Sequence, residues 1–264
     1  SYAPRFVISC TERLLTEVAR TAKEQKALVH THASENLKEI QLVKQLVHCE
    51  NVEYLHQLGL TSPELVLAHC VWLKPNEKDI LRDTGTHVVH CPSSNMKLAS
   101  GFAHVPELRS RGINVALGAD GAPCNNNLDM FQEMRLAALI HKPSAGPRAM
   151  RAQEVLDMAT RDGAKALGWF DDIGSIEVGK KADLIGIDVL APENRVPAPA
   201  LEAKSMDSEA FASSVVYSSS PRHLRWTMVD GRPVYEKGRV ATIPTAALLA
   251  RVHKAQLSIA RAIR

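Results

Sequence analysis

The chain has 264 residues, 45% of them hydrophobic, and its 32 basic and 29 acidic residues leave a net charge of +3. Because positive and negative charges nearly balance, there is no electrostatic reason to expect nucleic acid or an anionic membrane as a partner. No apolar run reaches the roughly 18 residues that a membrane-spanning helix needs, and the N-terminus lacks the pattern of a signal peptide. The five cysteines are dispersed and form no CxxC pair, which predicts reduced thiols and a cytoplasmic location.

Helical and strand-like patterns alternate through the first two thirds of the chain, beginning with an amphipathic helix at 11–26 that Thr11 would cap. Strands are expected near 6–9 and at 27–32, 65–70, 87–92 and 113–120. Further helices are expected at 36–48, 50–58, 75–85, 102–112, 127–141, 151–159 and 161–168. This alternation with short connections predicts an α/β fold with a parallel sheet.

After about residue 173 the pattern changes to turn glycines and short strand-like runs. A Pro-rich stretch at 191–209 is expected to be a loop, and Asp230-Gly231 is a strong hairpin signal. The other expected elements are strands within 174–189, 213–220 and 224–240, and a helix at 245–263. These patterns indicate a small β domain beside the α/β region.

Four of the expected strands end in polar side chains, namely His32, His69, His90 and Asp120. A lone histidine at a strand end is most often a hydrogen-bonded core residue. In a parallel β/α barrel, however, the C-terminal ends of the strands meet at one mouth, where active sites lie. Three histidines and an aspartate at the same rim therefore indicate a functional site.

The residue types at this rim suit metal-assisted chemistry. The imidazole of His32 and the carboxylate of Asp120 are ligands that zinc accepts, and a catalytic zinc keeps one position open for water. Glu35 lies three residues past His32, where it can face a substrate and move protons. His69 can hydrogen-bond the attacking water or the developing oxyanion. His30 shares a face with His32 by strand alternation, and we expect it to be packed one layer deeper.

The remaining strand-end residues are assigned by alternation. His87 and His90 lie three apart on one strand, so their side chains face opposite ways. We favour His90 as the neighbour of the site, because it begins the turn His-Cys-Pro-Ser-Ser-Asn. Cys70 and Cys91 follow the inward histidines directly, so alternation turns them away, and we expect them to be packing residues.

Four motifs in order carry a resemblance that covers essentially the whole chain: HTHASEN, LAHC, HCPSSNMKLASG and GADGAPCNNNLDMFQEMR. Together with the closing GSIEVGKKADLIGID, they resemble the amidohydrolase superfamily, in its branch of hydrolytic deaminases that act on purines and their nucleosides. The resemblance implies a (β/α)8 TIM-type barrel with a small β-sandwich-like domain and one divalent metal. Zinc is the default metal, although Fe²⁺ or Mn²⁺ would suit the same ligands.

The same resemblance implies a role for each residue at the rim. His32 and Asp120 would be metal ligands, and Glu35 would protonate a ring nitrogen of the substrate. His69 would orient the hydroxide or the tetrahedral oxygen, and Asp120 would also accept the proton of the attacking water. The implied reaction is attack of metal-activated water on an amidine carbon of a heterocycle, followed by loss of ammonia.

The chain departs from the family in one respect, because no second His-x-His motif supplies the two further metal ligands of the first barrel strand. At most five of eight barrel strands are expected. The chain therefore resembles the C-terminal portion of a longer enzyme, with part of the barrel over 1–172, a small β domain over 173–244 and a C-terminal helix over 245–264. Alone, this piece is expected to be inactive and poorly folded, with open sheet edges and weak metal binding.

The substrate signals divide. Arg5 and Phe6 resemble the residues of guanine deaminases that contact the base, since an arginine can donate to ring acceptors and a phenylalanine can stack. An arginine paired to an acidic neighbour and a phenylalanine in the core are the structural alternative. The loop after Asp120 is closer to deaminases of 5'-deoxyadenosine, methylthioadenosine or S-adenosylhomocysteine, and it also resembles triazine hydrolases. We favour an adenosine-type substrate, with guanine or 8-oxoguanine deaminases and s-triazine amino- or chlorohydrolases as alternatives.

Two other classes stay open. One is a non-catalytic barrel relative, which the absence of a His-x-His strand upstream of Ser1 would favour. The other is a hydrolase with two metals bridged by a carboxylated lysine, although no lysine lies at an expected strand end here. The chain could also form a homo-oligomer.

Overall fold

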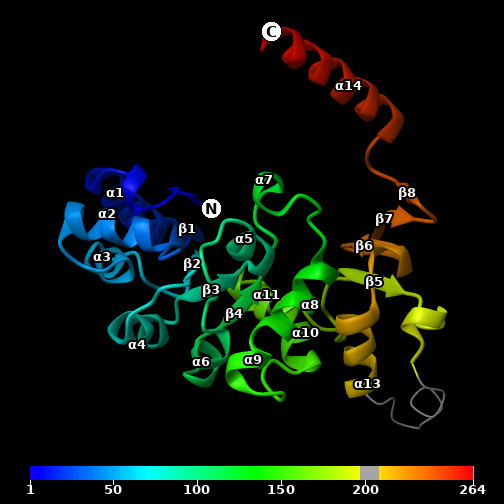
Figure 1. The fold of residues 1–264 in the computed structure, drawn as a ribbon, viewed down its shortest axis with the longest axis horizontal. Helices are drawn as coiled ribbons and strands as arrows, with labels where there is room; N and C mark the ends of the chain where they lie inside the picture. The colour runs from blue at the N-terminus through cyan, green and yellow to red at the C-terminus, as the bar shows by residue number, and fades with distance from the viewer. Residues whose placement is uncertain (197–207, 264) are drawn as a thin grey trace.

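The computed structural model describes residues 1–196 and 208–263, and its first part is built around a parallel sheet with the order β1-β2-β3-β4 (Figure 1). The strands are β1 (Val29–Ala33), β2 (Leu65–His69), β3 (His87–His90) and β4 (Val115–Leu117). The helices of this region are α1 (Glu12–Gln25), α2 (Leu37–Val47), α3 (Asn51–Gln57), α4 (Pro75–Thr84), α5 (Pro92–Lys97), α6 (Val105–Ser110), α7 (Ala122–Asn125), α8 (Met130–Ile140), α9 (Lys142–Ala145), α10 (Ala152–Ala159) and α11 (Arg161–Ala166). The expected α/β fold with a parallel sheet is confirmed, and the four strands do not close into a barrel within the described residues.

Local signals explain where several helices begin and end. The hydroxyl of Thr11 accepts the N–H of Leu14 at 3.2 Å and caps α1, as expected. Asn36 and Glu39 form a reciprocal capping box at the start of α2. Helix α4 ends at Gly85, whose φ of +70° is the left-handed conformation that glycine adopts without strain.

Side chains alternate between the two faces of the parallel sheet, and one face packs on the buried apolar core. In β1, Val29, Thr31 and Ala33 are buried, whereas His30 and His32 lie on the other face and are more exposed. Strand β2 is buried along its whole length. The core therefore fixes the strands from one side and leaves the second face of β1 free to present histidines.

Two expected strands are wrong, because local packing favours helical turns. Residues near 6–9 form the 3-10 helix η1 (Val7–Ser9), which is closed by the bond from the N–H of Ser9 to the carbonyl of Phe6. The segment at 213–220 is helical, with α13 (Ser208–Ser213) followed by the π-helical turn η3 (Ser214–Ser218). Two adjacent valines of η3 are both buried, which a helical turn allows and a half-buried strand does not.

The expected loop at 191–209 lies largely outside the described residues, which exclude 197–207. Where it is described, it contains the 3-10 helix η2 (Pro192–Asn194), and Ser208 and Glu209 already belong to α13. The prediction of loop is therefore wrong at its C-terminal end, because α13 begins there.

The C-terminal part contains an antiparallel sheet with the order β5-β6-β7-β8. Its elements are β5 (Leu184–Ile187), η4 (Pro221–His223), β6 (Leu224–Val229), β7 (Arg232–Glu236), β8 (Arg239–Val240) and helix α14 (Thr245–Ala262). The predicted hairpin is confirmed, since Asp230 and Gly231 join β6 to β7 with φ values of +48° and +73°. Helix α14 extends away from the rest of the chain and has no buried residue (Figure 1). None of the helices in residues 1–196 and 208–263 is both long and apolar enough to span a bilayer.

Candidate active site

A cavity of about 280 Å³ opens at the C-terminal ends of the parallel strands. The residues that line it include Arg5, Phe6, His32, Glu35, His69 and Asp120. Six of the seven side chains that the sequence predicted for the site therefore lie together, and the seventh, His90, lies elsewhere.

His32 is oriented by a backbone carbonyl. Its Nδ1 lies 2.7 Å from the carbonyl oxygen of Arg5. Because a carbonyl oxygen only accepts, Nδ1 carries a proton, and in the neutral ring the lone pair lies on Nε2. A carbonyl that holds the second nitrogen of a histidine in this way is the usual outer partner of a metal ligand. The chemistry of His32 therefore fits a ligand role.

Asp120 follows β4 and has a φ of +62°, an uncommon conformation for a residue other than glycine. Its Oδ2 accepts the hydroxyl of Ser94 at 2.5 Å, and its Oδ1 accepts the N–H of Gly121 at 2.5 Å. Partial burial alone would raise the pKa of Asp120. The bonds from Ser94 and Gly121 outweigh it, so the pKa lies below the ordinary value. The carboxylate is therefore ionised at neutral pH.

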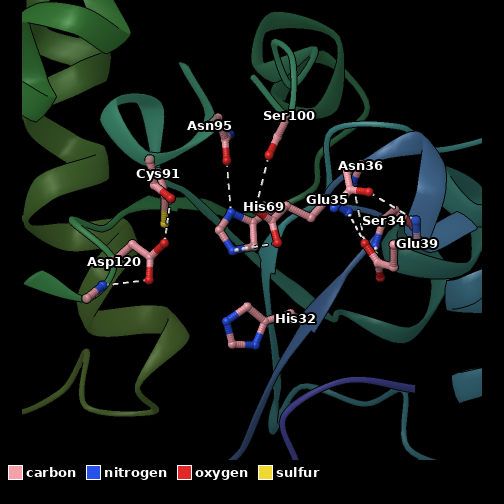
Figure 2. A network of polar contacts seen from close by, with 12 residues as sticks. His32, Ser34, Glu35, Asn36, Glu39, His69, Cys91, Asn95, Ser100 and Asp120 are labelled. Carbon is pink, nitrogen blue, oxygen red and sulfur yellow. Dashed lines mark hydrogen bonds and ion pairs between the residues drawn. The ribbon is translucent and has the colours of Figure 1, made fainter. Parts of the chain in front are cut away.

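Glu35 and His69 lie next to each other in the lining of the cavity (Figure 2). Glu35 Oε2 lies 3.9 Å from His69 Nε2, and Glu35 Oε1 accepts the hydroxyl of Ser100 at 3.0 Å. The Nδ1 of His69 lies 2.8 Å from the side-chain oxygen of Asn95. The ring of His69 also lies over that of His32, with centroids 5.3 Å apart. The two histidines and the two carboxylates thus form one constellation.

Two buried carboxylates that the sequence reasoning missed support these loops. Glu39 accepts the N–H groups of Ser34 and Glu35 at 3.2 and 2.7 Å and the amide of Asn51 at 2.5 Å. It thereby fixes the turn that carries Glu35. The pattern Asn36-x-x-Glu39 is a readable capping-box signal, so this support could have been found from the sequence.

The second buried carboxylate is Glu133 of α8, which is completely inaccessible to solvent. It accepts the backbone N–H of Ser93 at 3.1 Å, the hydroxyl of the same residue, and the amide of Asn125 at 2.8 Å. Glu133 therefore joins the loops that follow β3 and β4. No local sequence pattern pairs residues 40 positions apart, so this contact could not be predicted.

Arg5 and Phe6 lie at the mouth of the cavity. The guanidinium carbon of Arg5 is 5.2 Å from the centroid of the Phe6 ring, and that ring is 6.2 Å from the ring of His32. Arg5 is exposed and Phe6 is half-buried. This placement matches a pair that can contact a ligand and differs from the alternative of a core phenylalanine.

Two histidines lie where the sequence reasoning did not expect them. His90 is fully buried, does not line the cavity and faces His141 with ring centroids 5.5 Å apart. Alternation in β3 directs His90 toward the helical layer, and burial lowers its pKa to about 3. The structure thus gives no support for a substrate contact by His90. His30 was expected to be packed in the core, but it is exposed beside His32. The face of β1 that carries both histidines is not covered by other described residues.

The donor set for a metal is incomplete within the described residues. His32 and Asp120 offer an imidazole lone pair and an ionised carboxylate on one cavity, which suits zinc. No group of three or more His, Cys, Asp or Glu side chains in residues 1–196 and 208–263 could hold a metal ion. These two residues therefore fit part of a ligand set.

Comparison with known proteins agrees with this class of site. The Amidohydrolase family profile matches residues 1–234. A 5'-deoxyadenosine deaminase of Methanosarcina acetivorans is 40% identical over 240 residues, covering 90% of this chain and 52% of the relative. A 5-methylthioadenosine/S-adenosylhomocysteine deaminase of Syntrophobacter fumaroxidans is also 40% identical, over 94% of this chain and 55% of the relative.

Solved structures show the same likeness. The crystal structure of an adenosine deaminase from Xanthomonas campestris with bound zinc superposes with a TM-score of 0.90 at 32% identity, over 99% of this chain and 57% of that one. The fold and the strand-end cavity define an α/β protein with a candidate site at the C-terminal edge of a parallel sheet. The chain belongs to the amidohydrolase family. It spans just over half the length of the relatives it matches.

Proposed function

We propose that this chain is part of a metal-dependent hydrolytic deaminase that acts on an adenosine-type purine nucleoside, and that it contributes catalytic side chains to the active site. The observation that carries the proposal is the convergence of Glu35, His69, Asp120 and His32 on one cavity. The similarity of the chain to deaminases of 5'-deoxyadenosine and of methylthioadenosine/S-adenosylhomocysteine supports the substrate class. In the proposed reaction, water replaces the amino group of the ring and ammonia leaves.

Each side chain has a role that its contacts support. A divalent cation, with zinc as the first choice, would be held in part by His32 and Asp120 and would supply Lewis acidity that makes water nucleophilic near neutral pH. Asp120 takes up the proton of the attacking water. Glu35 delivers a proton to the ring nitrogen next to the reacting carbon. His69 donates or accepts a hydrogen bond at the oxygen that adds to this carbon.

The rest of the proposed architecture goes beyond the described residues. We infer that the parallel sheet belongs to a (β/α)8 barrel over 1–172 and that 173–244 belongs to a small β-sandwich-like domain, followed by the helix over 245–264. Further strands would supply the remaining metal ligands. The outer edge of β4, with which no strand of the described residues pairs, supports this inference. The edge of β1 carries only a single parallel bridge, to Tyr2.

A second substrate class is favoured by one specific observation. Arg5 and Phe6 line the cavity, where a guanidinium can donate to ring acceptors and an aromatic ring can stack on a base. That pair suits guanine or a related oxopurine. An s-triazine that bears an amine or chloride could undergo the same displacement.

The test is ammonia release by the metal-replete protein expressed from the complete reading frame that encodes this chain. The panel contains 5'-deoxyadenosine, S-adenosylhomocysteine, guanine and an s-triazine amine. We expect turnover of the two adenosines. Turnover of guanine alone would overturn the substrate class, and silence across the panel with zinc bound would overturn the deaminase proposal.

A further inference from the structure

The segment from Ser93 to Ser100, which contains α5, touches every polar group of the constellation except His32. The hydroxyl of Ser94 donates to Asp120 Oδ2 at 2.5 Å, and that of Ser100 donates to Glu35 Oε1 at 3.0 Å. Between them, Asn95 contacts His69 at 2.8 Å (Figure 2). Asn95 is 1% exposed, so water cannot replace it in this contact.

We propose that Asn95 is a positioning residue that sets the orientation and the tautomer of the His69 ring. The atom of Asn95 that faces His69 Nδ1 is the side-chain oxygen, which only accepts. Nδ1 therefore carries a proton, and Nε2 is the nitrogen that faces Glu35 and the cavity. The inference rests on the proposed function, because the exposed nitrogen of His69 acts on a substrate only if this cavity is the reaction site.

The ring of His69 needs such a partner for a conformational reason. Its backbone has a φ of +75°, which is uncommon for residues other than glycine and persists where surrounding contacts hold it. The χ2 torsion of histidine is broad and nearly two-fold, so a flipped ring, with Cδ2 in the place of Nδ1 and Cε1 in the place of Nε2, would fit at little steric cost. One buried hydrogen bond to a fixed acceptor selects one of the two orientations.

Asn95 can serve as that fixed acceptor because its own backbone is held on both sides. Its N–H donates to the carbonyl of Cys91 at 3.0 Å, and its carbonyl accepts the N–H of Ser100 at 2.8 Å. Two residues earlier, the N–H and hydroxyl of Ser93 are bound by the buried carboxylate of Glu133. The position of Asn95 is therefore fixed from the core side, and its side chain transmits this order to His69.

The test is long-range ¹H–¹⁵N NMR of the histidine ring nitrogens in the metal-replete protein from the complete reading frame, with His69 assigned through His69→Gln. Asn95→Leu removes the acceptor at similar volume, and Asn95→Asp keeps an oxygen in its place. Thr86→Val is the matched control, because Thr86 is equally buried and its hydroxyl bonds only to groups outside the cavity.

We expect a proton on Nδ1 of His69 in the unmodified protein, in Asn95→Asp and in Thr86→Val. Asn95→Leu should shift His69 toward the tautomer protonated on Nε2 alone. It should also lower kcat about 10- to 100-fold, because a misplaced catalytic group can cost about 100-fold in rate, with KM changed less than about threefold. A neutral ring protonated only on Nε2 in the unmodified protein would overturn the inference. So would an Asn95→Leu variant with unchanged tautomer and kcat.

These readouts separate the two proposals. The tautomer is observed whether or not any compound in the panel is turned over, so failure of the deaminase proposal leaves the position of the proton measurable. If Asn95→Leu does not fold, the unmodified protein and Asn95→Asp still decide which nitrogen carries the proton.

Discussion

The two parts of the molecule bury their apolar residues to different degrees. Strand β2 of the parallel sheet is buried along its whole length, whereas every residue of β5 to β8 is at least partly exposed. Ile176 and Val178 are 86% and 109% exposed. The candidate site belongs to the buried part, where strand ends and loops are fixed from below. The C-terminal part carries apolar surface that no described residue covers, and we expect it to contribute little to the stability of the site.

The largest expected effect lies in the site itself. Glu35→Gln removes a proton carrier while its turn stays bound to Glu39, and we expect kcat for ammonia release to fall about 10²- to 10⁴-fold. Glu64→Gln is the control, because Glu64 is exposed just before β2 and outside the cavity. Equal activity of the two variants would show that the reaction does not use Glu35.

The difference in burial predicts a difference in stability. Leu67→Ala in β2 creates a cavity in the core and should lower the free energy of unfolding by about 3 kcal/mol. Leu249→Ala in α14, where Leu249 is 62% exposed, should change it by less than about 0.5 kcal/mol. Urea unfolding measures both. Equal losses would mean that α14 is packed against the folded protein in solution.

Acid should destabilise the buried part through His90 and His141, whose pKa values burial lowers to about 3 and about 4 from an ordinary 6.5. Below pH 6.5 these two histidines bind protons in the unfolded chain but stay neutral in the folded chain. Stability is therefore complete above that pH and falls as the pH decreases toward 4, by about 1.4 kcal/mol per unit for each histidine.

The same prediction has a direct variant test. His90→Phe keeps a buried ring without a titrating group, so the dependence of unfolding free energy on pH between 6.5 and 5 should become shallower. His253→Phe on exposed α14 should leave it unchanged. Unfolding free energies measured across this range decide the matter. An equal slope in His90→Phe and in the unmodified protein would refute the assignment.

The smallest expected effect concerns helix capping. Asn36→Ala removes the N-cap of α2 and should cost about 1 kcal/mol, because the N–H of Glu39 loses its acceptor. Thr245→Ala at the start of α14, where no side chain caps the helix, should cost less than about 0.5 kcal/mol. Thermal unfolding of the two variants, followed beside the unmodified protein, provides the comparison.

The sequence predicted the parallel sheet, the hairpin at Asp230-Gly231 and the strand-end placement of His32 and His69, because these depend on local periodicity and turn chemistry. The prediction that His90 points toward the site was wrong. A strand of only four residues does not reveal from its sequence which of its two faces the helices cover. The sequence reasoning also missed Asn95 and Glu133. Their partners are 26 and 40 residues away, and only tertiary packing brings such groups together.

The central claim is that water replaces an amino group at the strand-end cavity. The most direct measurement is deamination of 5'-deoxyadenosine in H₂¹⁸O by the metal-replete protein, with the product analysed by mass spectrometry and ammonia quantified in parallel. We expect one ¹⁸O atom in the ring product for each ammonia released, and loss of both signals in Glu35→Gln. Ammonia release without ¹⁸O in the product, or labelled product from Glu35→Gln at the unmodified rate, would contradict the account.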